Sequence, residues 1–283
     1  MNNLLQRLLL FFVGVPALLA LVVFLPQFHH AAMMVVVLVF TVGGSLELAS
    51  LFRSSGLAVN RPAFAATGLL VPGSFYAATF LPPLPFDPLL AFVAVFALAS
   101  FVPYSFSAKE RLPESLSCAA AQAFALFYTG ILGGFVTLII AWKGKGTEAI
   151  LAYAAMVIMN DSLAWLFGVT LGRRRNLVAV SPNKSLAGFI GGLAGSCGGA
   201  LAIQAIFPDA MIASRGLVLL MGLVVGIAVI VGDLFESALK RSAGAKDSGS
   251  SIPGRGGFLD SFDSLLFAAP VFYAGTLLLG LFR

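Results

Sequence analysis

The chain has 283 residues, of which 59% are hydrophobic and 10% are charged, and its mean hydropathy is +1.00. Soluble globular proteins carry about 25% charged residues, and disordered chains are poor in apolar residues, so this composition excludes both classes. The net charge of +5 indicates basic cytoplasmic loops and an anionic partner, and we expect no nucleic acid among its partners. Unbroken apolar runs about as long as a bilayer-crossing helix, instead of alternating strands, predict an all-α polytopic integral membrane protein.

The apolar runs predict about nine transmembrane helices, separated at most joints by prolines or charged residues. Their approximate ranges are 4–25, 31–52, 63–81, 88–104, 116–142, 148–171, 185–206, 214–236 and 264–282. The run 116–142 is long for one crossing and is expected to tilt or to emerge from the membrane. Polar residues and glycines gather after residue 145. We therefore expect an N-terminal region of about five spans, residues 1–145, and a catalytic region, residues 146–283, with a cytoplasmic loop at 237–263.

Basic residues divide unequally between the two sides that these spans create. The loops on the N-terminal side hold most of the 17 Lys and Arg residues, and the other side keeps only Lys143, Lys145, Arg215 and Arg283. Positively charged loops stay in the cytoplasm. We therefore expect the N-terminus and the loop 237–263 inside and the C-terminus outside, in a bacterial inner or plasma membrane.

Acidic residues are scarce, and Asp233 and Glu236 follow directly on an apolar run. Acids at such depth are costly unless they are paired, so they are functional candidates. Asp233, Glu236, Ser237 and Lys240 recur at i, i+3, i+4 and i+7, which places them on one face of a helix. The alternative interpretation is a helix end that leaves the membrane with solvated charges.

Two further acids lie inside apolar spans. Asp161, in the run Asn160-Asp161-Ser162, is a functional candidate, with a structural buried acid as the alternative. Glu47 follows two glycines and a serine but stands isolated in its span, so a functional and a structural role are equally open.

The stretch 237–263 combines basic residues with Gly, Ser and carboxylates. Ammonium and guanidinium groups neutralise phosphate oxygens, and glycine lets backbone N–H groups approach them. Carboxylates suit Mg²⁺, which prefers oxygen ligands and usually bridges to substrate phosphates. The composition therefore indicates a phosphate site with Mg²⁺, although many cytoplasmic loops share it and the chain has no Walker loop and no GxGxxG motif.

Basic and small residues also precede and fill the span 185–206. The triplet Arg173-Arg174-Arg175 is typical of a topology determinant that contacts anionic membrane lipids. The run from Ser181 to Ser185, which contains Lys184, is expected to begin a helix whose positive end can meet phosphate. The glycines between 188 and 199 recur at small-xxx-small spacing and predict close helix packing.

One order of residues in the stretch 237–263 is specific. It comprises Ser237, Lys240, Arg241, Lys246, Asp247, Pro253, Gly256, Gly257, Asp260 and Asp263. The stretch resembles the signature of the phosphatidate cytidylyltransferase, or CDP-diacylglycerol synthase, family, which runs S-x-x-K-R-x4-K-D, then Pro-Gly and H-G-G, then D-R-x-D. Similar motifs stand at 160–162, 168–172, 181–185 and 232–237. The resemblance covers about residues 155–270, whereas residues 1–145 match only as a set of apolar helices.

Two positions depart from that signature. Arg255 stands where the family has His, and Ser261 stands where it has Arg. Relative to the signature, one base is gained at position 255 and another is lost six residues later, so the local charge stays roughly the same. Either the activity is retained with a rearranged phosphate contact, or it is weakened.

The resemblance implies an enzyme that transfers the cytidylyl group of CTP to phosphatidic acid and releases CDP-diacylglycerol and pyrophosphate for phospholipid synthesis. Both substrates are polyanionic, and the lipid phosphate is itself a nucleophile, so catalysis needs positioning and charge neutralisation. The implied partners are CTP, phosphatidic acid and membrane lipids, and a homodimer is an open alternative for the assembly. A CTP-dependent kinase of a polyprenol or phytol is the alternative enzyme, and an ion-coupled transporter using Asp161 and Asp233 is the alternative from another class.

The resemblance also assigns roles to residues. It places Mg²⁺, in a two-cation centre, on Asp233 and Asp260. The expected catalytic residues are Lys240, Arg241, Lys246, Asp247 and Ser237. The expected substrate-binding residues are Asp161, Lys184, Ser181, Arg255, Gly256 and Gly257.

Overall fold

The structure, a computed structural model, describes residues 10–82, 87–106, 109–175 and 177–282. Residues 4–9 of the first predicted span, together with Arg7 and Arg283, lie outside the described residues. Within the described ranges the chain forms helices and no strands, which confirms the all-α class. The elements are η1 (Leu10–Gly14), α2 (Val15–Phe24), α3 (Gln27–Ser54), α4 (Arg61–Ala78), α5 (Pro88–Ser105), η2 (Lys109–Arg111), α6 (Leu112–Ala125), η3 (Leu126–Ile131), α7 (Leu132–Ile140), α8 (Gly146–Leu171), α9 (Leu186–Ile206), α10 (Arg215–Ser242) and α11 (Phe258–Leu279).

Every predicted span coincides with helix in the described part of the chain. Seven helices there, with α6, η3 and α7 counted as one rod, are long and apolar enough to cross a membrane. The two that fall short are α2, which is a short apolar helix, and α4, whose buried face includes Thr67, Gly68 and Pro72. The chain is thus a polytopic membrane protein, whereas the number of nine crossings stays a prediction.

The predicted loop 237–263 is shorter in the structure than the sequence suggested. Helix α10 continues to Ser242 and α11 already begins at Phe258, so the connecting loop comprises residues 243–257. The extension of α10 carries an ion pair between Glu236 and Lys240, one helical turn apart. The early start of α11 carries an acid in its first turn, Asp260, which accepts a backbone hydrogen bond just before the helix.

Helix starts follow from side chains that bind free backbone N–H groups. Asn60 accepts from the N–H of Ala63 at the start of α4, and Ser185 accepts from the N–H of Gly188 at the start of α9. The cap at Ser185 confirms the helix start that the sequence predicts there. It also fixes the end of the loop that carries Lys184.

Glycines bring α8 and α9 into close contact. A Cβ atom at Gly195 would collide with the backbone of Met159, and one at Gly199 would lie 2.7 Å from the carbonyl oxygen of Ala155. Only glycine permits this separation of the two helix backbones, so the predicted role of the small residues in packing is confirmed.

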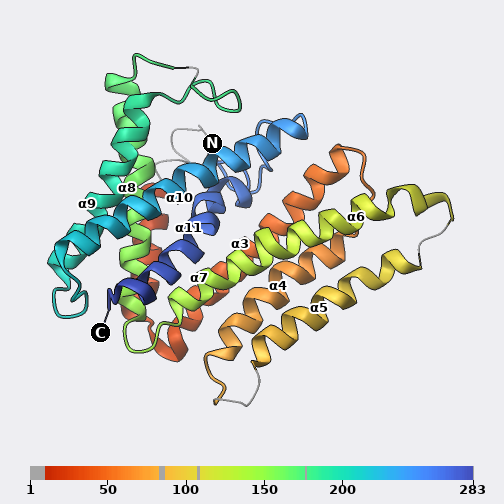
Figure 1. The fold of residues 1–283 in the computed structure, drawn as a ribbon, viewed down its shortest axis with the longest axis horizontal. Coiled ribbons are helices and arrows are strands. Elements are labelled where there is room, and N and C mark those ends of the chain that lie inside the picture. Colours follow the sequence, from red (N-terminus) through yellow and green to blue (C-terminus); the bar gives the residue numbers. More distant parts are fainter. Residues whose placement is uncertain (1–9, 83–86, 107–108, 176, 283) are drawn as a thin grey trace.

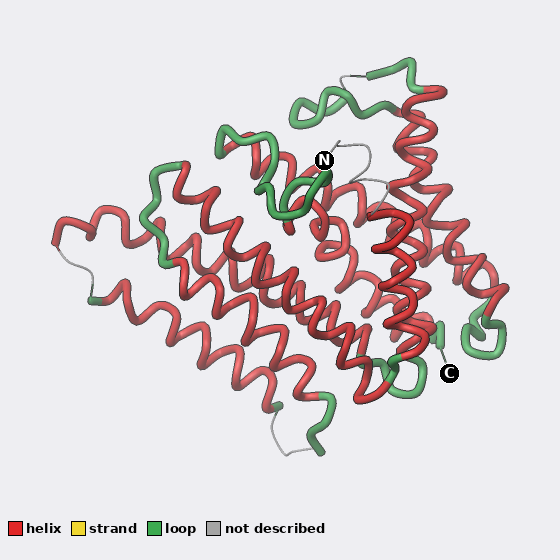
Figure 2. The backbone as a smooth tube through the Cα atoms, turned by 180° about the vertical axis from the view of Figure 1, so that it is seen from behind, coloured by secondary structure: helices red, strands yellow, loops and turns green. Residues whose placement is uncertain are grey.

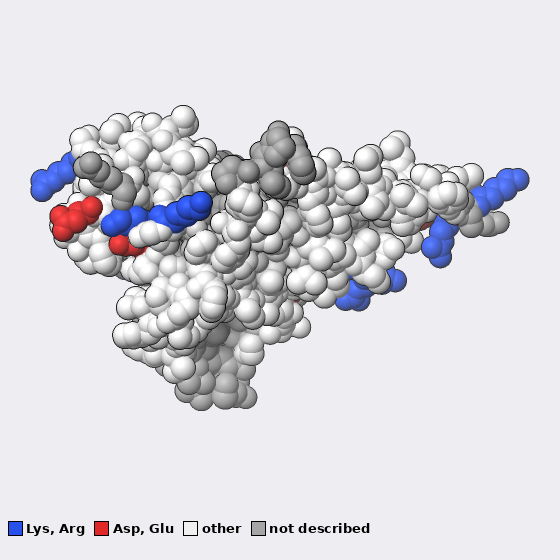
Figure 3. Space-filling view, turned by 90° about the horizontal axis from the view of Figure 1, so that it is seen from below, with Lys and Arg blue, Asp and Glu red and all other residues white. Residues whose placement is uncertain are grey.

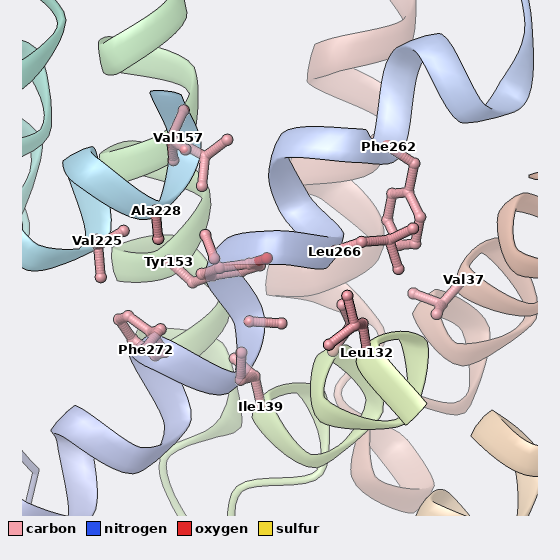
Figure 4. Close-up of a cluster of buried hydrophobic side chains, with 14 of the residues drawn as sticks. Val37, Leu132, Ile139, Tyr153, Val157, Val225, Ala228, Phe262, Leu266 and Phe272 are labelled. Atoms are coloured by element: carbon pink, nitrogen blue, oxygen red, sulfur yellow. The ribbon is translucent and has the colours of Figure 1, made fainter. Parts of the chain in front are cut away.

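Helix α11 lies at the centre of the described structure. It packs against α3, α7, α8 and α10, and Figure 4 shows Leu266 and Phe272 of α11 among side chains from all four helices. The hydroxyl of Tyr153, on α8, donates to the backbone carbonyl of Leu265. These contacts join elements on both sides of residue 145, so the two predicted regions share one core; the boundary between them stays a prediction.

The connecting loops gather at two opposite edges of an array of helices that tapers toward one end (Figure 1). The loops after α3, α8 and α10 lie at the upper edge, and the loops after α4, α7 and α9 lie at the lower edge with the C-terminal end. The view from behind shows the same division (Figure 2). Seen from below, most of the charged side chains in view lie toward the two ends of the molecule (Figure 3).

Candidate functional site

A cavity of about 730 Å³ lies among α3, α8, α9, α10 and α11 and reaches the loops at the upper edge. Part of its wall is apolar and includes Met33, Val37 and Phe40 from α3, together with Trp165 from α8. Another part carries acids and bases from three helices and two loops. The cavity is therefore amphipathic, as a site for a lipid with a charged headgroup must be.

Four carboxylates from three different helices line this cavity. They belong to Asp161 on α8, Asp233 on α10, and Asp260 and Asp263 on α11. Lys184, from the loop before α9, forms an ion pair with Asp233. Arg255, from the loop before α11, also lines the cavity, and its charge acts on Asp161. The structure thus places Asp161, Lys184, Asp233 and Arg255 in the wall of one cavity.

Lys240 lies beside this group instead of in the cavity wall. Its ammonium nitrogen lies 2.6 Å from Oδ1 of Asp260 and also pairs with Glu236, whose side chain is 1% exposed. The Lys240 side chain is itself only 12% exposed. The alternative of a helix end with solvated charges therefore does not describe Glu236 and Lys240, which form a largely buried cluster with Asp260.

Asp260 receives hydrogen bonds on both of its carboxylate oxygens. Oδ1 accepts from Lys240, while Oδ2 accepts from the backbone N–H groups of Gly257 at 2.8 Å and Ser248 at 2.9 Å. The hydroxyl of Ser248 lies 3.0 Å from the same Oδ2. Asp260 also lines the cavity, so it holds the loop 243–257 in place from the edge of the site.

The two glycines of the signature have a packing reason in this structure. Gly256 has a φ of +108°, and a Cβ atom there would lie 2.7 Å from Oδ2 of Asp260. A Cβ atom at Gly257 would collide with the carboxylate of Glu47 and with the hydroxyl of Ser248. Glycine at both positions lets the loop close around two carboxylates.

Glu47 contacts the same loop, although the sequence left it isolated. Its carboxylate accepts hydrogen bonds from residues that follow it by 201 to 212 positions. No local spacing signals such a pair. Asp263 belongs to the signature, but the sequence assigns it no role. Its position three residues after Asp260 indicates that the two acids share a helix face.

The other predicted residues do not line the cavity in the described part of the chain. They are Ser181, Ser237, Arg241, Lys246, Asp247, Gly256 and Gly257. Arg241 donates to the carbonyl oxygen of Ala245 at 3.1 Å, and Lys246 and Asp247 are exposed on the loop. The structure therefore separates the exposed bases of the signature from the acids of the cavity.

The cavity offers oxygen donors suited to a hard divalent cation such as Mg²⁺. Asp161, Asp233 and Asp263 supply carboxylates there, whereas both oxygens of Asp260 are already hydrogen-bonded. As the side chains stand, no three Asp, Glu, His or Cys residues of the described ranges converge on one point as metal ligands. The chemistry of these carboxylates fits the ion, although Asp233 and Asp260 each already bind a lysine, Lys184 and Lys240.

Comparison with known proteins shows the family to which the chain belongs. Residues 5–279 match the model of the Cytidylyltransferase family. The phosphatidate cytidylyltransferases of Staphylococcus saprophyticus and Staphylococcus haemolyticus are each 36% identical over 172 residues, which is 61% of this chain and 64% of the relative. That of Staphylococcus aureus strain COL is 34% identical over 178 residues, with the same coverage. The chain thus spans somewhat less than two thirds of the length of these relatives.

A further relative has no assigned activity. The uncharacterized protein YnbB of Escherichia coli K12 is 40% identical over 128 residues, which is 45% of this chain and 42% of that protein.

Proposed function

The chain belongs to the Cytidylyltransferase family, and we propose that it transfers the cytidylyl group of CTP to phosphatidic acid, giving CDP-diacylglycerol and pyrophosphate for phospholipid synthesis. The observation that carries this proposal is the amphipathic cavity. Its apolar wall suits acyl chains, and its charged part holds four acids beside Arg175, Lys184 and Arg255. A lipid phosphate and a nucleotide triphosphate require such a border between apolar and charged surroundings.

The reaction needs no nucleophile from the protein. An oxygen of the lipid phosphate attacks the α-phosphorus of CTP, a new P–O bond forms, and the bond from the α-phosphorus to the β-phosphate oxygen breaks, so pyrophosphate leaves. The protein supplies orientation and charge neutralisation. Arg175, Lys184 and Arg255 are cations of the described residues that line the cavity and can neutralise phosphate oxygens there.

We assign the exposed bases to the other substrate. Arg241 and Lys246 lie on the loop side of the cavity, and they are the residues that we propose to guide the triphosphate and the departing pyrophosphate. Ser237 and Asp247 stay predicted catalytic residues, and Ser181 stays a predicted substrate-binding residue. Lys240 acts indirectly, because its ion pair holds Asp260 at the start of α11.

We propose Mg²⁺ as the cofactor. Bound Mg²⁺ supplies neutralisation of phosphate charge during the transfer. Asp233 remains the first proposed ligand, and Asp161 and Asp263 face the same cavity with the carboxylate chemistry that the ion prefers. Asp260 also lines the cavity, and Oδ1 of its carboxylate accepts a hydrogen bond from Lys240 with one of its two lone pairs, so Asp260 remains the second proposed ligand.

The orientation in the membrane is part of the proposal. We infer that the upper edge of Figure 1, with the loop 243–257, faces the cytoplasm, where CTP is found, and that the C-terminal end faces outward. The loops at the lower edge include Lys143 and Lys145, which belong to the smaller basic set.

The test uses purified protein in detergent with Mg²⁺, CTP labelled on the α-phosphate, and separate panels of phosphatidic acid, polyprenol and diacylglycerol. We expect labelled CDP-diacylglycerol and pyrophosphate with phosphatidic acid only. Formation of CDP with polyprenol would identify a lipid kinase instead, and no nucleotide turnover with any lipid would favour the transporter. Lys143→Gln, at the edge far from the cavity, is the matched control and should keep the wild-type rate.

A further inference from the structure

The carboxylate of Glu47 is enclosed by neutral hydrogen-bond donors from the loop before α11 and from the first residues of α11. Oε1 accepts from the hydroxyl of Ser251 at 2.8 Å and the N–H of Phe258 at 3.0 Å. Oε2 accepts from the hydroxyl of Ser248 at 2.8 Å and the N–H of Leu259 at 2.9 Å. The Glu47 residue is only 7% exposed. Burying a carboxylate costs free energy unless hydrogen bonds compensate for the lost water. The four donors provide this compensation, so the fold specifies the position of the Glu47 carboxylate.

These donors include the first backbone N–H groups of α11. Phe258 and Leu259 open the helix, and their N–H groups have no carbonyl partner within it. Glu47 satisfies both from α3, and its negative charge stands at the positive end of the helix dipole. Asp260 satisfies the N–H of Gly257, immediately before the helix. The start of α11 is therefore held by one local acid and one remote acid.

The two acids act on the loop as one unit, because they share Ser248. Its hydroxyl lies 2.8 Å from Oε2 of Glu47 and 3.0 Å from Oδ2 of Asp260. The backbone N–H of Ser248 binds Asp260 as well. A hydroxyl carries one proton, so it donates to one carboxylate at a time while the remaining donors hold the other.

Glycines in the loop and on α3 provide the space that this arrangement requires. Gly249 and Gly257 of the loop border the Glu47 carboxylate so closely that a Cβ atom at either position would collide with it. On α3, a Cβ atom at Gly43 would collide with the ring of Phe258. The close approach of α3 to the start of α11 is thus specified on both sides.

From these contacts we propose that Glu47 is a positioning residue for the transfer reaction: it clamps the loop 243–257 to α3 and thereby sets where Arg255 and Asp260 stand at the cavity. Glu47 does not line the cavity itself, so it acts through the loop and does not touch the substrates. Only the predicted effect of Glu47 on activity rests on the proposed function. The clamp itself is a statement about the loop and can be measured without any substrate.

The experiment compares Glu47→Gln with Glu148→Gln in the full chain in detergent. Glu148 is the matched control, because it is also an acid on a transmembrane helix but forms its ion pair with Lys145, at 3.9 Å, near the opposite edge. Trypsin cleavage after Lys246 and Arg255 reports the loop, and cleavage after Lys143 reports the opposite edge. The melting temperature and kcat and KM for CTP complete the set.

We expect Glu47→Gln to speed cleavage in the loop by about 10-fold or more, as for loss of charge-assisted hydrogen bonds, with unchanged cleavage after Lys143. The value of kcat should fall by about 10- to 100-fold, which corresponds to about one such bond lost at the transition state. Ser248→Ala should do the same in part, and its combination with Glu47→Gln should be less than additive, because both changes open one clamp.

A wild-type rate of loop cleavage in Glu47→Gln would overturn the proposal. Cleavage that is accelerated equally after Lys143, together with a lower melting temperature, would also overturn it, because that result indicates a general loss of fold. Faster loop cleavage with unchanged kcat would overturn the positioning role. If the wild-type protein makes no CDP-diacylglycerol, the proposed function fails, and the cleavage data still decide the clamp. Should Glu47→Gln fail to fold, the double variant Ser248→Ala, Ser251→Ala removes both hydroxyl donors with Glu47 intact, and it must also open the loop.

Discussion

The ammonium group of Lys240 lies 2.6 Å from the carboxylate of Asp260, and this contact ties the end of α10 to the start of α11. The same nitrogen pairs with Glu236, so one cation serves two acids that are 1% and 7% exposed. Removing one partner from a buried ionic group leaves the others without compensation, which costs much more than the loss of a surface ion pair.

We therefore expect Lys240→Met to destabilise the protein by about 3 kcal/mol, because it strands Glu236 and Asp260. Lys145→Met is the matched control, since Lys145 is 30% exposed and lies 3.9 Å from Glu148. The control should cost less than about 1 kcal/mol. Thermal and denaturant unfolding in detergent measure the loss of stability in both variants. Equal losses in the two variants would contradict the role of Lys240 in the buried cluster.

Asp233 and Asp260 should respond differently to the same substitution. Asp233 faces the cavity and pairs with Lys184, so Asp233→Asn should leave the melting temperature near that of the wild type and abolish Mg²⁺-dependent formation of CDP-diacylglycerol. Asp260→Asn should abolish the activity and also cost about 1.5–3 kcal/mol of stability, because Asp260 braces the loop through charge-assisted hydrogen bonds. Wild-type rates in Asp233→Asn would disprove its assignment as a metal ligand.

Arg255 and Ser261, the two departures from the signature, both line the cavity. Arginine is always charged and offers a fork of donors suited to phosphate, so we propose that Arg255 replaces part of the missing cation at 261. Arg255→Ala should slow CDP-diacylglycerol synthesis by about 10- to 150-fold, the equivalent of one charge-assisted hydrogen bond. Arg255→His combined with Ser261→Arg should be tolerated much better than Arg255→His alone.

A double-mutant cycle on the synthesis rate measures this compensation. Simple addition of the two effects would show that the positions are independent. A wild-type rate in Arg255→Ala would show that Arg255 is a bystander and that the loop tolerates variation there. The hydroxyl of Ser261 donates to the carbonyl oxygen of Gly257 at 3.2 Å, so the cycle should include Ser261→Ala as the control for loss of that bond.

Local spacing was sufficient to predict part of this site. The pairing of Glu236 with Lys240 follows from an i, i+4 interval, and the cap at Ser185 follows from a serine before an apolar run. Both depend only on helix geometry, which the sequence encodes within a few residues. The apolar runs likewise predicted the positions of the helices, while their ends moved because caps and ion pairs extended α10 and α11.

Contacts between distant segments could not be predicted in that way. The hydroxyl of Ser248 and the carboxylate of Glu47 are 201 positions apart, and only the packing of α3 on α11 brings them together. The ion pair between Lys184 and Asp233 likewise joins a loop to a helix across 49 positions. Neither interval is a helix or strand period, so composition identified these residues as unusual without indicating their partners.

The division of the loops between two edges gives a prediction about orientation. The loop 243–257 lies at the upper edge of Figure 1, and the loop that contains Lys143 lies at the lower edge. In a variant with Cys118 and Cys197 replaced by alanine, a single cysteine placed at Lys143 should react with a membrane-impermeant maleimide on intact cells. A single cysteine at Lys246 should react only after the membrane is opened, because basic loops are retained in the cytoplasm. A reporter fused after Arg283 should also lie outside. Labelling of both cysteines from the same side would mean that a span separating the two loops does not cross the membrane, and it would remove the proposed access of CTP to the cavity.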